Sequence, residues 1–162
     1  MRNLLRLLVI FFIITGTTHS AIADALPLPE PTTSERFKVG QVWTYKTRTV
    51  ETGSRVIIGK IEKIPQIGTV VHVKLVGLHL KNPLADGGYG SVIQHLPVSE
   101  AALLDSVVAR TSDVADLTGF SDGYETWLSA YRNEGAGVFT GPLAEIADMM
   151  EQVINSQRKR KS

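Results

Sequence analysis

His95 is the residue of this sequence best suited to acid–base chemistry. It follows a glycine-rich stretch, residues 82–91, and lies between two carboxylates in the chain, Asp86 and Glu100. An imidazole beside a carboxylate can act as a general base. One interpretation is therefore a small hydrolase or isomerase that uses His95 with a nearby carboxylate. The alternative is a histidine that packs at a strand end or faces solvent.

The histidines do not form a metal-binding pattern. His72 and His79 are seven residues apart, and residues separated by an odd number point to opposite sides of a regular strand. The chain contains no cysteine and no His-x-His or His-Glu-x-x-His motif, which are usual sources of zinc ligands. We therefore expect neither a metal site nor a cofactor.

Residues 119–123 match the G-x-S-x-G motif of the nucleophile elbow. That motif needs a strand before the serine and, in this class of hydrolase, a histidine later in the chain. No strand pattern precedes Ser121, and His95 is the last histidine of the sequence. The motif therefore indicates a turn that begins a helix.

Positive charge gathers in one half of the chain. Residues 36–83 hold nine Lys or Arg and two acids, whereas residues 84–157 hold two Arg and eleven acids. Strand alternation places one set of side chains on the outer side of the predicted sheet: Lys46, Arg48, Lys60, His72 and Lys74. Such a face favours docking of an acidic protein or other polyanionic envelope component. The alternative is a solvated face whose charges keep edges from pairing.

Alternation of apolar and polar residues predicts the strands that must position these side chains. The pattern runs over residues 41–49, 55–63 and 69–80, and a short fourth strand fits residues 92–96. Turn-forming residues separate the segments.

Helical spacing follows the strands. Ser99 is suited to cap a helix over residues 100–110. A second helix, within residues 122–135, carries Trp127 on its apolar stripe, and a third follows Pro142. The order of these elements, with the strands first and the helices after them, predicts an α+β fold. We expect an antiparallel three- to four-stranded meander followed by about three helices packed on one face.

Length and composition fit one globular domain. The chain has 162 residues, of which 43% are apolar and 20% are charged. These values exclude a disordered chain, a collagen-like repeat and a coiled-coil rod. A net charge of +1 gives no signature of sequence-specific nucleic-acid binding.

The N-terminus has the features of an export signal. Arg2 and Arg6 precede eight apolar residues, 7–14, and residues 21–23 (Ala-Ile-Ala) have the small-x-small cleavage pattern. The apolar core is about half the ~20 residues that span a membrane. We therefore expect no transmembrane segment after processing, with cleavage after Ala23; Ala25 is a second candidate.

The remaining chain divides into three parts. A Pro-rich linker covers residues 24–35, a single α+β domain covers residues 36–157, and a basic tail covers residues 158–162. The tail, Arg158 to Lys161, is either a solvated end or a contact for an anionic surface. The second interpretation leaves open a structural protein associated with the envelope.

Several motifs resemble those of a family of small uncharacterised bacterial proteins. The resemblance spans roughly residues 36–155 and implies a bacterial source and a single domain, but no activity, ligand or catalytic residue. The motifs that carry it are Gly40-Gln41-Val42-Trp43-Thr44-Tyr45-Lys46-Thr47-Arg48, Lys81-Asn82-Pro83, His95-Leu96-Pro97-Val98-Ser99-Glu100, Gly123-Tyr124 with Trp127, and Ala136-Gly137-Val138-Phe139-Thr140.

These patterns favour an exported, periplasmic or secreted, non-enzymatic binding domain. The expected partner is a protein, and the expected contact surface is the basic sheet face. An inhibitor- or immunity-like role is one form of this binding function. The alternatives are an enzyme that uses His95 and a structural envelope protein.

Overall fold

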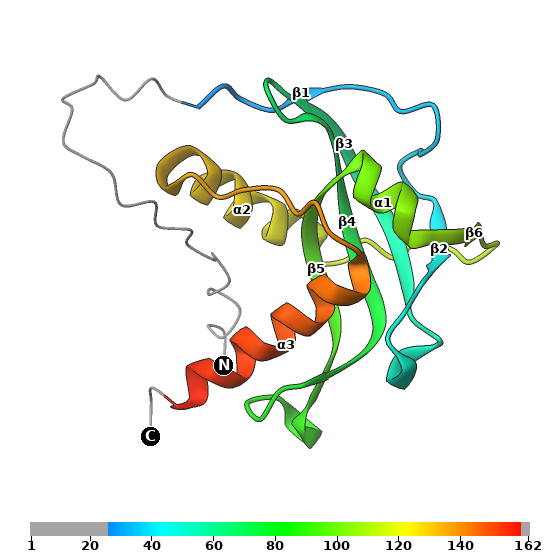
Figure 1. Cartoon of the computed structure of the whole chain (residues 1–162), viewed down its shortest axis with the longest axis vertical. Helices are drawn as coiled ribbons and strands as arrows, with labels where there is room; N and C mark the ends of the chain where they lie inside the picture. The colour runs from blue at the N-terminus through cyan, green and yellow to red at the C-terminus, as the bar shows by residue number, and fades with distance from the viewer. Residues whose placement is uncertain (1–25, 160–162) are drawn as a thin grey trace.

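The computed structural model describes residues 26–159, and these form an α+β structure (Figure 1). Six strands make one antiparallel sheet in the order β5-β4-β3-β2-β6, and β1 pairs with β3 off this path. The strands are β1 (Glu30–Pro31), β2 (Val42–Tyr45), β3 (Arg55–Ile64), β4 (Gly68–Lys81), β5 (Tyr89–Ser99) and β6 (Val107–Arg110). The helices are α1 (Glu100–Ser106), α2 (Phe120–Glu134) and α3 (Leu143–Lys159), with 3-10 turns η1 (Thr49–Glu51) and η2 (Asp86–Gly88).

The predicted α+β class is confirmed, and the sheet has more strands than expected. Its centre is the long hairpin of β3 and β4, in which Ile58 pairs with Val73 and Val56 pairs with Leu75. β-branched and aliphatic residues fit the pleated surface of buried strands. This hairpin carries most of the side chains of the candidate site.

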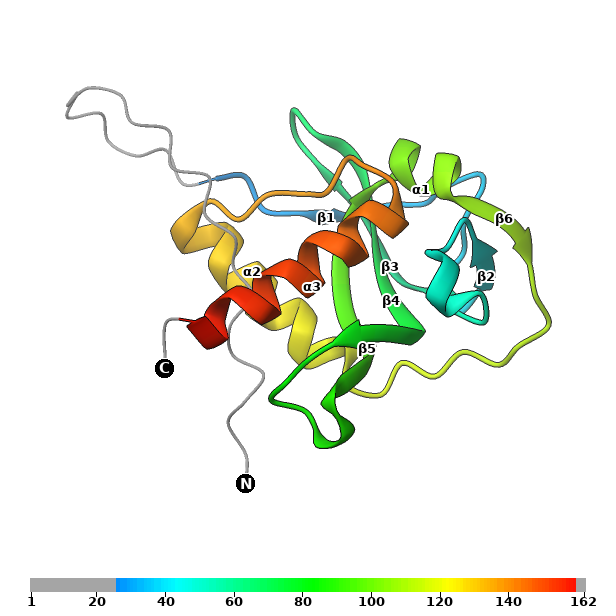
Figure 2. The ribbon, with the colours of Figure 1, turned by 60° about the horizontal axis from the view of Figure 1, so that its bottom comes forward.

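The helices lie on both faces of the sheet, so the prediction that they pack on one face is wrong. Val71, Val73 and Leu75 of β4 point to the face covered by α1 and α3, where they share a core with Leu103 and Ile146. Figure 2 shows α3 running across this side of the sheet.

The opposite face is covered by α2. Val70 of β4 packs there with Ile64 and with four aromatic residues of α2: Phe120, Tyr124, Trp127 and Tyr131. The side of the predicted sheet that was expected to face solvent is therefore an interior.

Two segments differ from their predicted elements. The helix expected over residues 100–110 ends at Ser106, and residues 107–110 become the edge strand β6. Ser99 caps the helix as expected, with its side chain accepting from Ala102 N at 3.3 Å. The β-branched Val107 and Val108 favour the strand over another helical turn.

The N-terminal part of the described chain runs along the domain rather than away from it. β1, inside the predicted linker, pairs Glu30 with Lys63. The Tyr131 hydroxyl of α2 donates to Pro27 O at 2.9 Å. The predicted signal peptide, residues 1–23, lies outside the described residues, and α3 extends into the predicted tail as far as Lys159.

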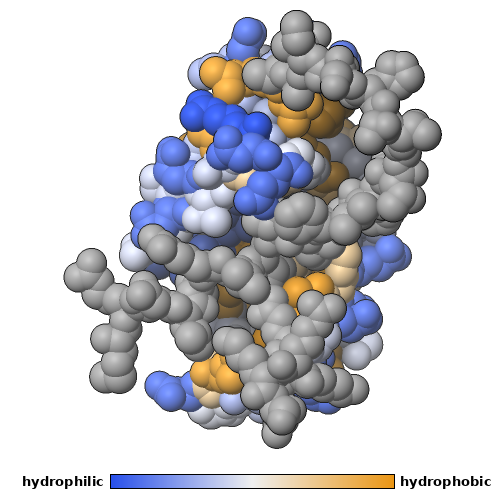
Figure 3. Space-filling model, turned by 90° about the vertical axis from the view of Figure 1, so that its left-hand side faces the viewer, coloured by the Kyte–Doolittle hydropathy of each residue, from blue (hydrophilic) through white to orange (hydrophobic). Residues whose placement is uncertain are grey.

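No helix of the described residues is both long enough and apolar enough to span a membrane. The visible surface on the side of α2 and α3 is mostly hydrophilic, with apolar spots near its two ends (Figure 3).

Candidate functional site

Two β-bulges shape the sheet face beneath α2. Gly59 is the extra residue of β3 between the pairs of Ile58 and Lys60. In β5 the register shifts between Ile93 and Leu96, so Gln94 and His95 together oppose one residue of β4, Lys74. Bulges re-aim side chains, and here they turn polar groups from three strands toward α2.

Glu62 is the centre of the resulting polar cluster. Its Oε1 lies 2.7 Å from Lys60 Nζ, and the Tyr124 hydroxyl of α2 donates to both carboxylate oxygens at 3.0 Å. Its Oε2 lies 3.1 Å from His72 Nε2, at ion-pair distance but without the alignment of a hydrogen bond. The Glu62 side chain is 2% exposed, so these contacts replace the water that a carboxylate needs.

His72 joins this carboxylate to His95. His72 Nδ1 and His95 Nε2 are 2.9 Å apart. With Glu62 ionised, we assign the His72 proton to Nε2, facing the carboxylate. His72 Nδ1 then accepts from His95 Nε2–H, and His95 Nδ1 carries no proton. The carboxylate linked to His95 is Glu62, and the link runs through His72.

The carboxylates nearest to His95 in the sequence do not take this role. Glu100 contacts Ser34 instead, and Asp86 is exposed in η2. Distance along the sequence does not identify the carboxylate linked to His95, because Glu62 lies on β3, two strands away from β5 in the sheet.

Aromatic residues of α2 cover the two histidines. The ring of His72 lies 4.8 Å from Trp127 and 5.2 Å from Tyr124, centroid to centroid. The ring of His95 lies 5.5 Å from Phe120. Gly123 permits this approach, because a Cβ at that position would lie 2.7 Å from the Cβ of His95.

Three of the motifs that carry the family resemblance meet at this cluster. His95 comes from the His-Leu-Pro motif, and Trp127 from the motif that begins at Gly123. Trp127 Nε1 donates to Gly137 O at 3.1 Å, and Phe139 N donates to Pro97 O at 2.9 Å. The motifs therefore include residues that fasten α2 and the following segment to β5.

Burial keeps both histidines neutral. Burial, with the neighbouring His72 as a smaller cause, lowers the pKa of His95 to about 3. Burial also lowers the pKa of His72, although Glu62 opposes that effect. Burial raises the pKa of Glu62, but His72, Lys60 and Tyr124 outweigh it and bring that pKa to about 2. The cluster is thus an ionised carboxylate with one cation, Lys60, and two neutral imidazoles.

The five predicted binding residues do not form one exposed surface. His72 is fully buried, and Lys74 is 4% exposed and donates to Thr118 O at 2.8 Å. Lys60 is on the same face, paired with Glu62. Lys46 is exposed near α1, where its Nζ donates to Asp105 O at 2.8 Å. The alternation of β4 was correct, but α2 covers the face.

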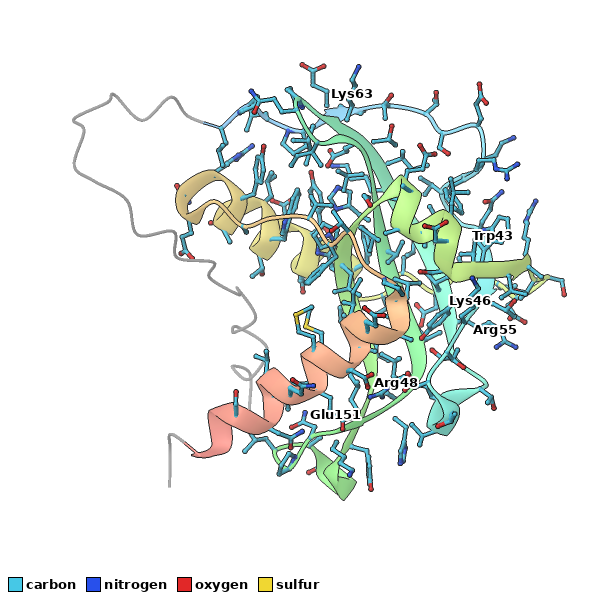
Figure 4. All side chains as sticks on the ribbon, in the orientation of Figure 1. Trp43, Lys46, Arg48, Arg55, Lys63 and Glu151 are labelled. Atoms are coloured by element: carbon cyan, nitrogen blue, oxygen red, sulfur yellow. The ribbon has the colours of Figure 1, made fainter. Side chains whose placement is uncertain are left out.

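The fifth residue, Arg48, belongs to a separate network on the other side of the molecule. It lies 2.8 Å from Glu51 and 3.1 Å from both Asp148 and Glu151 of α3. Figure 4 shows Arg48 and Glu151 facing each other between the sheet and α3. Its charge is therefore neutralised within the protein.

This network serves the end of β4 that extends beyond β3. The backbone of His79 donates to Glu51 Oε2 at 2.8 Å, and its carbonyl accepts from Arg48 at 3.3 Å. The backbone of Lys81 donates to Glu151 Oε2 at 3.0 Å, and its carbonyl accepts from Asn155 at 3.1 Å. Side chains thus take the place of a neighbouring strand along residues 79–81.

A surface hollow lies at the opposite edge of the sheet, beside β6. Its volume is about 410 Å³. Two of its apolar side chains are open to solvent: Val108 is 65% exposed and Leu104 is 36% exposed. The lining residues are Glu35, Arg36, Phe37, Trp43, Leu104, Val107 and Val108. Sequence reasoning missed this hollow, because it assigned residues 107–110 to a helix.

Other sequence motifs have plain structural roles. Ser121 is exposed in the first turn of α2, and no strand leads into it, as the interpretation of the G-x-S-x-G motif expected. Among the described residues, no three His, Cys, Asp or Glu side chains are grouped so as to hold a metal ion.

Comparison with known proteins adds no relative: no family model, no curated protein and no solved structure matches this chain. The class of the protein rests on its own geometry, which is an α+β domain with a buried Glu–His–His cluster and a surface hollow of mixed apolar and charged lining at one sheet edge.

Proposed function

We propose that the protein is an exported binding domain that holds a segment of a partner protein in the hollow beside β6. The observation that carries the proposal is the hollow itself, with exposed Val108 and Leu104 beside partly buried Trp43. Exposed apolar groups gathered beside a concavity, with charged residues at the rim, are typical of binding sites.

The chemistry of the surroundings favours a partner segment that is apolar with acidic residues. Arg36, Lys46 and Arg110 are exposed around this edge, beside one exposed carboxylate of the lining, Glu35. Within the described chain these three cations form no ion pair. Figure 4 shows Trp43, Lys46 and Arg55 at this end of the molecule. Positive charge at a rim attracts an acidic partner and makes association depend on salt.

The specific observation that favours an enzyme instead is the chain from Glu62 through His72 to His95. A general base works best when its pKa is near the working pH. Burial holds the pKa of His95 at about 3, and its ring lies against Phe120 and Tyr124. We therefore assign this cluster a structural role.

Selection from displayed random peptides tests the binding function. The wild-type mature chain should enrich peptides that contain apolar and acidic residues, and their affinity should fall as salt rises. Leu104→Glu, in the hollow, should lose these peptides, whereas the control Leu84→Glu, at an exposed leucine of another loop, should retain them. Absence of enrichment, or equal binding by the two variants, would overturn the proposal.

The export part of the proposal has its own measurement. Mass spectrometry of protein from the periplasm or medium should find a chain that begins after Ala23 or Ala25. A chain with intact Met1 that stays in the cytoplasm would contradict it.

A further inference from the structure

β6 is an edge strand whose outer side is unpaired within the described part of the chain. It pairs with β2 on its inner side, and β2 pairs with β3. An exposed edge presents backbone N–H and C=O groups that can bind an added strand. β6 has four residues, enough for a short segment to pair.

The register shows which backbone groups face outward. Thr44 pairs with Ala109, and Thr111 N donates to Val42 O at 2.9 Å. Residues of an antiparallel strand alternate between those that bond one neighbour and those that bond the other. Ala109 and Thr111 face β2, so the N–H and C=O groups of Arg110 face away from the sheet. A bulge between the pairs Thr44–Ala109 and Tyr45–Val107 interrupts this alternation at Val108.

The hollow lies directly along this outward edge. Val108 belongs both to β6 and to the lining of the hollow, and Leu104 of α1 lies four residues before it. A strand added to β6 would direct every second side chain toward one face of the sheet. The hollow would receive one of these side chains, while the rim cations Arg36 and Arg110 would meet acidic residues.

We propose that the partner binds by strand addition: an extended segment with alternating apolar and acidic residues pairs with the outer edge of β6 and places an apolar side chain in the hollow. This inference rests on the proposed binding function and specifies its mode. Backbone pairing supplies affinity in such complexes, and the side-chain pocket supplies specificity. A second copy of this chain is a poorer occupant, because it would bring Arg110 and Lys46 of both copies to one edge.

Backbone N-methylation of the selected peptides separates strand addition from side-chain docking. In an extended peptide, alternate N–H groups face opposite edges, so methylation of one alternate set removes the bonds to β6. Methylation of that set should weaken binding of the peptide to the protein about tenfold or more, because each lost hydrogen bond contributes about 1 kcal/mol. The other set keeps those bonds and is the matched control, with a change of less than about twofold.

Protein variants locate the binding edge. Val108→Asp should abolish binding of the unmodified peptide, whereas Val114→Asp, at a valine that is 92% exposed in the following loop, should leave it unchanged. Circular dichroism of both variants should match the wild type.

The possible results separate the two proposals. If both methylated sets bind equally and Leu104→Glu still loses the peptides, strand addition is overturned and the binding function stands. If the free protein dimerises and Val108→Asp makes it monomeric, the occupant is a second copy and the inference is wrong. If no peptide is ever enriched, the binding function itself fails.

Discussion

Glu62 is the residue on which the buried cluster depends, because a nearly inaccessible carboxylate needs its partners. Lys60, Tyr124 and His72 all contact it within 3.1 Å. Removing one partner leaves charge that water cannot reach, and this is more harmful than losing an exposed contact.

Tyr124→Phe should lower the free energy of unfolding by about 1.5–3 kcal/mol, the usual range for a hydrogen bond to a charged group. The ring stays in place, so the loss measures the hydroxyl contact with Glu62. Urea unfolding near pH 7 checks it, with Tyr89→Phe, at a 45% exposed tyrosine, as the control. A loss below about 0.5 kcal/mol would show that Lys60 and His72 satisfy the carboxylate without the hydroxyl.

At the residue scale, the sequence predicted side-chain direction along β4 but not the partners. Alternation correctly placed His72 and Lys74 on one face, opposite Val71 and Val73. The bulges at Gly59 and at Gln94–His95 could not be predicted, because each adds a residue that no periodic pattern reveals. Whether that face is buried depends on α2, which comes some 50 residues later in the chain.

At the scale of elements, α2 is held by close packing rather than by helix propensity. Gly119 precedes it in a left-handed conformation, with φ of 78°, and Gly123 lies against His95. Glycine within a helix is unfavourable by itself, so its place here follows from the space available.

Gly123→Ala should therefore destabilise the protein, although alanine favours helices by about 1 kcal/mol. The added methyl group would lie 2.7 Å from the Cβ of His95, and overpacking of this kind costs about 1–3 kcal/mol. Thermal melting compares it with Ser129→Ala, at an exposed position of the same helix. Increased stability in Gly123→Ala would mean that α2 moves freely away from β5.

Acid should weaken the packing of α2. The folded pKa of His95 is about 3, against 6.5 for a free imidazole, so the unfolded chain binds the proton first. The stability provided by neutral His95 is complete above about pH 6.5 and falls by about 1.4 kcal/mol per pH unit below it. The pKa of Glu62 is lowered from 4.5 to about 2 in the folded protein. Below about pH 4.5 the unfolded chain therefore binds this proton first, and the free energy of unfolding falls further as the pH decreases.

Unfolding in urea at pH 7 and pH 5 measures this dependence. Wild type should lose about 2 kcal/mol through His95 between pH 6.5 and pH 5, with a further contribution in the same direction from His72. His95→Gln should flatten the slope, whereas His79→Gln, outside the cluster, should not. Charged groups that face the histidines are Glu62 and Lys60, and both keep their charge across this interval. Identical slopes in wild type and His95→Gln would exclude His95 as the source.

At the scale of the whole molecule, Arg48 joins parts of the chain that are distant in sequence. It contacts η1 through Glu51, the end of β4 through His79, and α3 through Glu151. Its side chain is 10% exposed and that of Glu51 is fully buried. The guanidinium group thus fastens α3 to the sheet.

Arg48→Ala should cost about 3–5 kcal/mol, because Glu51 would remain as an uncompensated buried charge. Adding Glu51→Gln to that variant should recover part of the loss, since a neutral amide needs no cation. A double-mutant cycle in denaturant measures the coupling. Additive effects of the two changes would show that the pair is not coupled.

The overall architecture was only partly predictable. The order of strands and helices predicted the α+β class, because periodicity reports local structure. Which face each helix covers, and the strand at residues 107–110, depend on long-range packing that one sequence does not show. Alternation also misassigned Arg48, which lies beyond the end of β2 and faces α3.

The overhanging end of β4 has a consequence for solubility. Residues 79–81 would otherwise present a bare strand edge, and there Glu51, Arg48, Glu151 and Asn155 occupy the backbone groups. Two of these four residues come from the second half of α3. A chain cut before Glu151 would lose the side chains that bond the backbone of Lys81, whereas Glu51 and Arg48 would still bond that of His79. Uncovered strand edges can pair with other chains. The last turns of α3 therefore cover part of this strand edge, and their proteolytic loss would leave the backbone of Lys81 open to pairing with another chain.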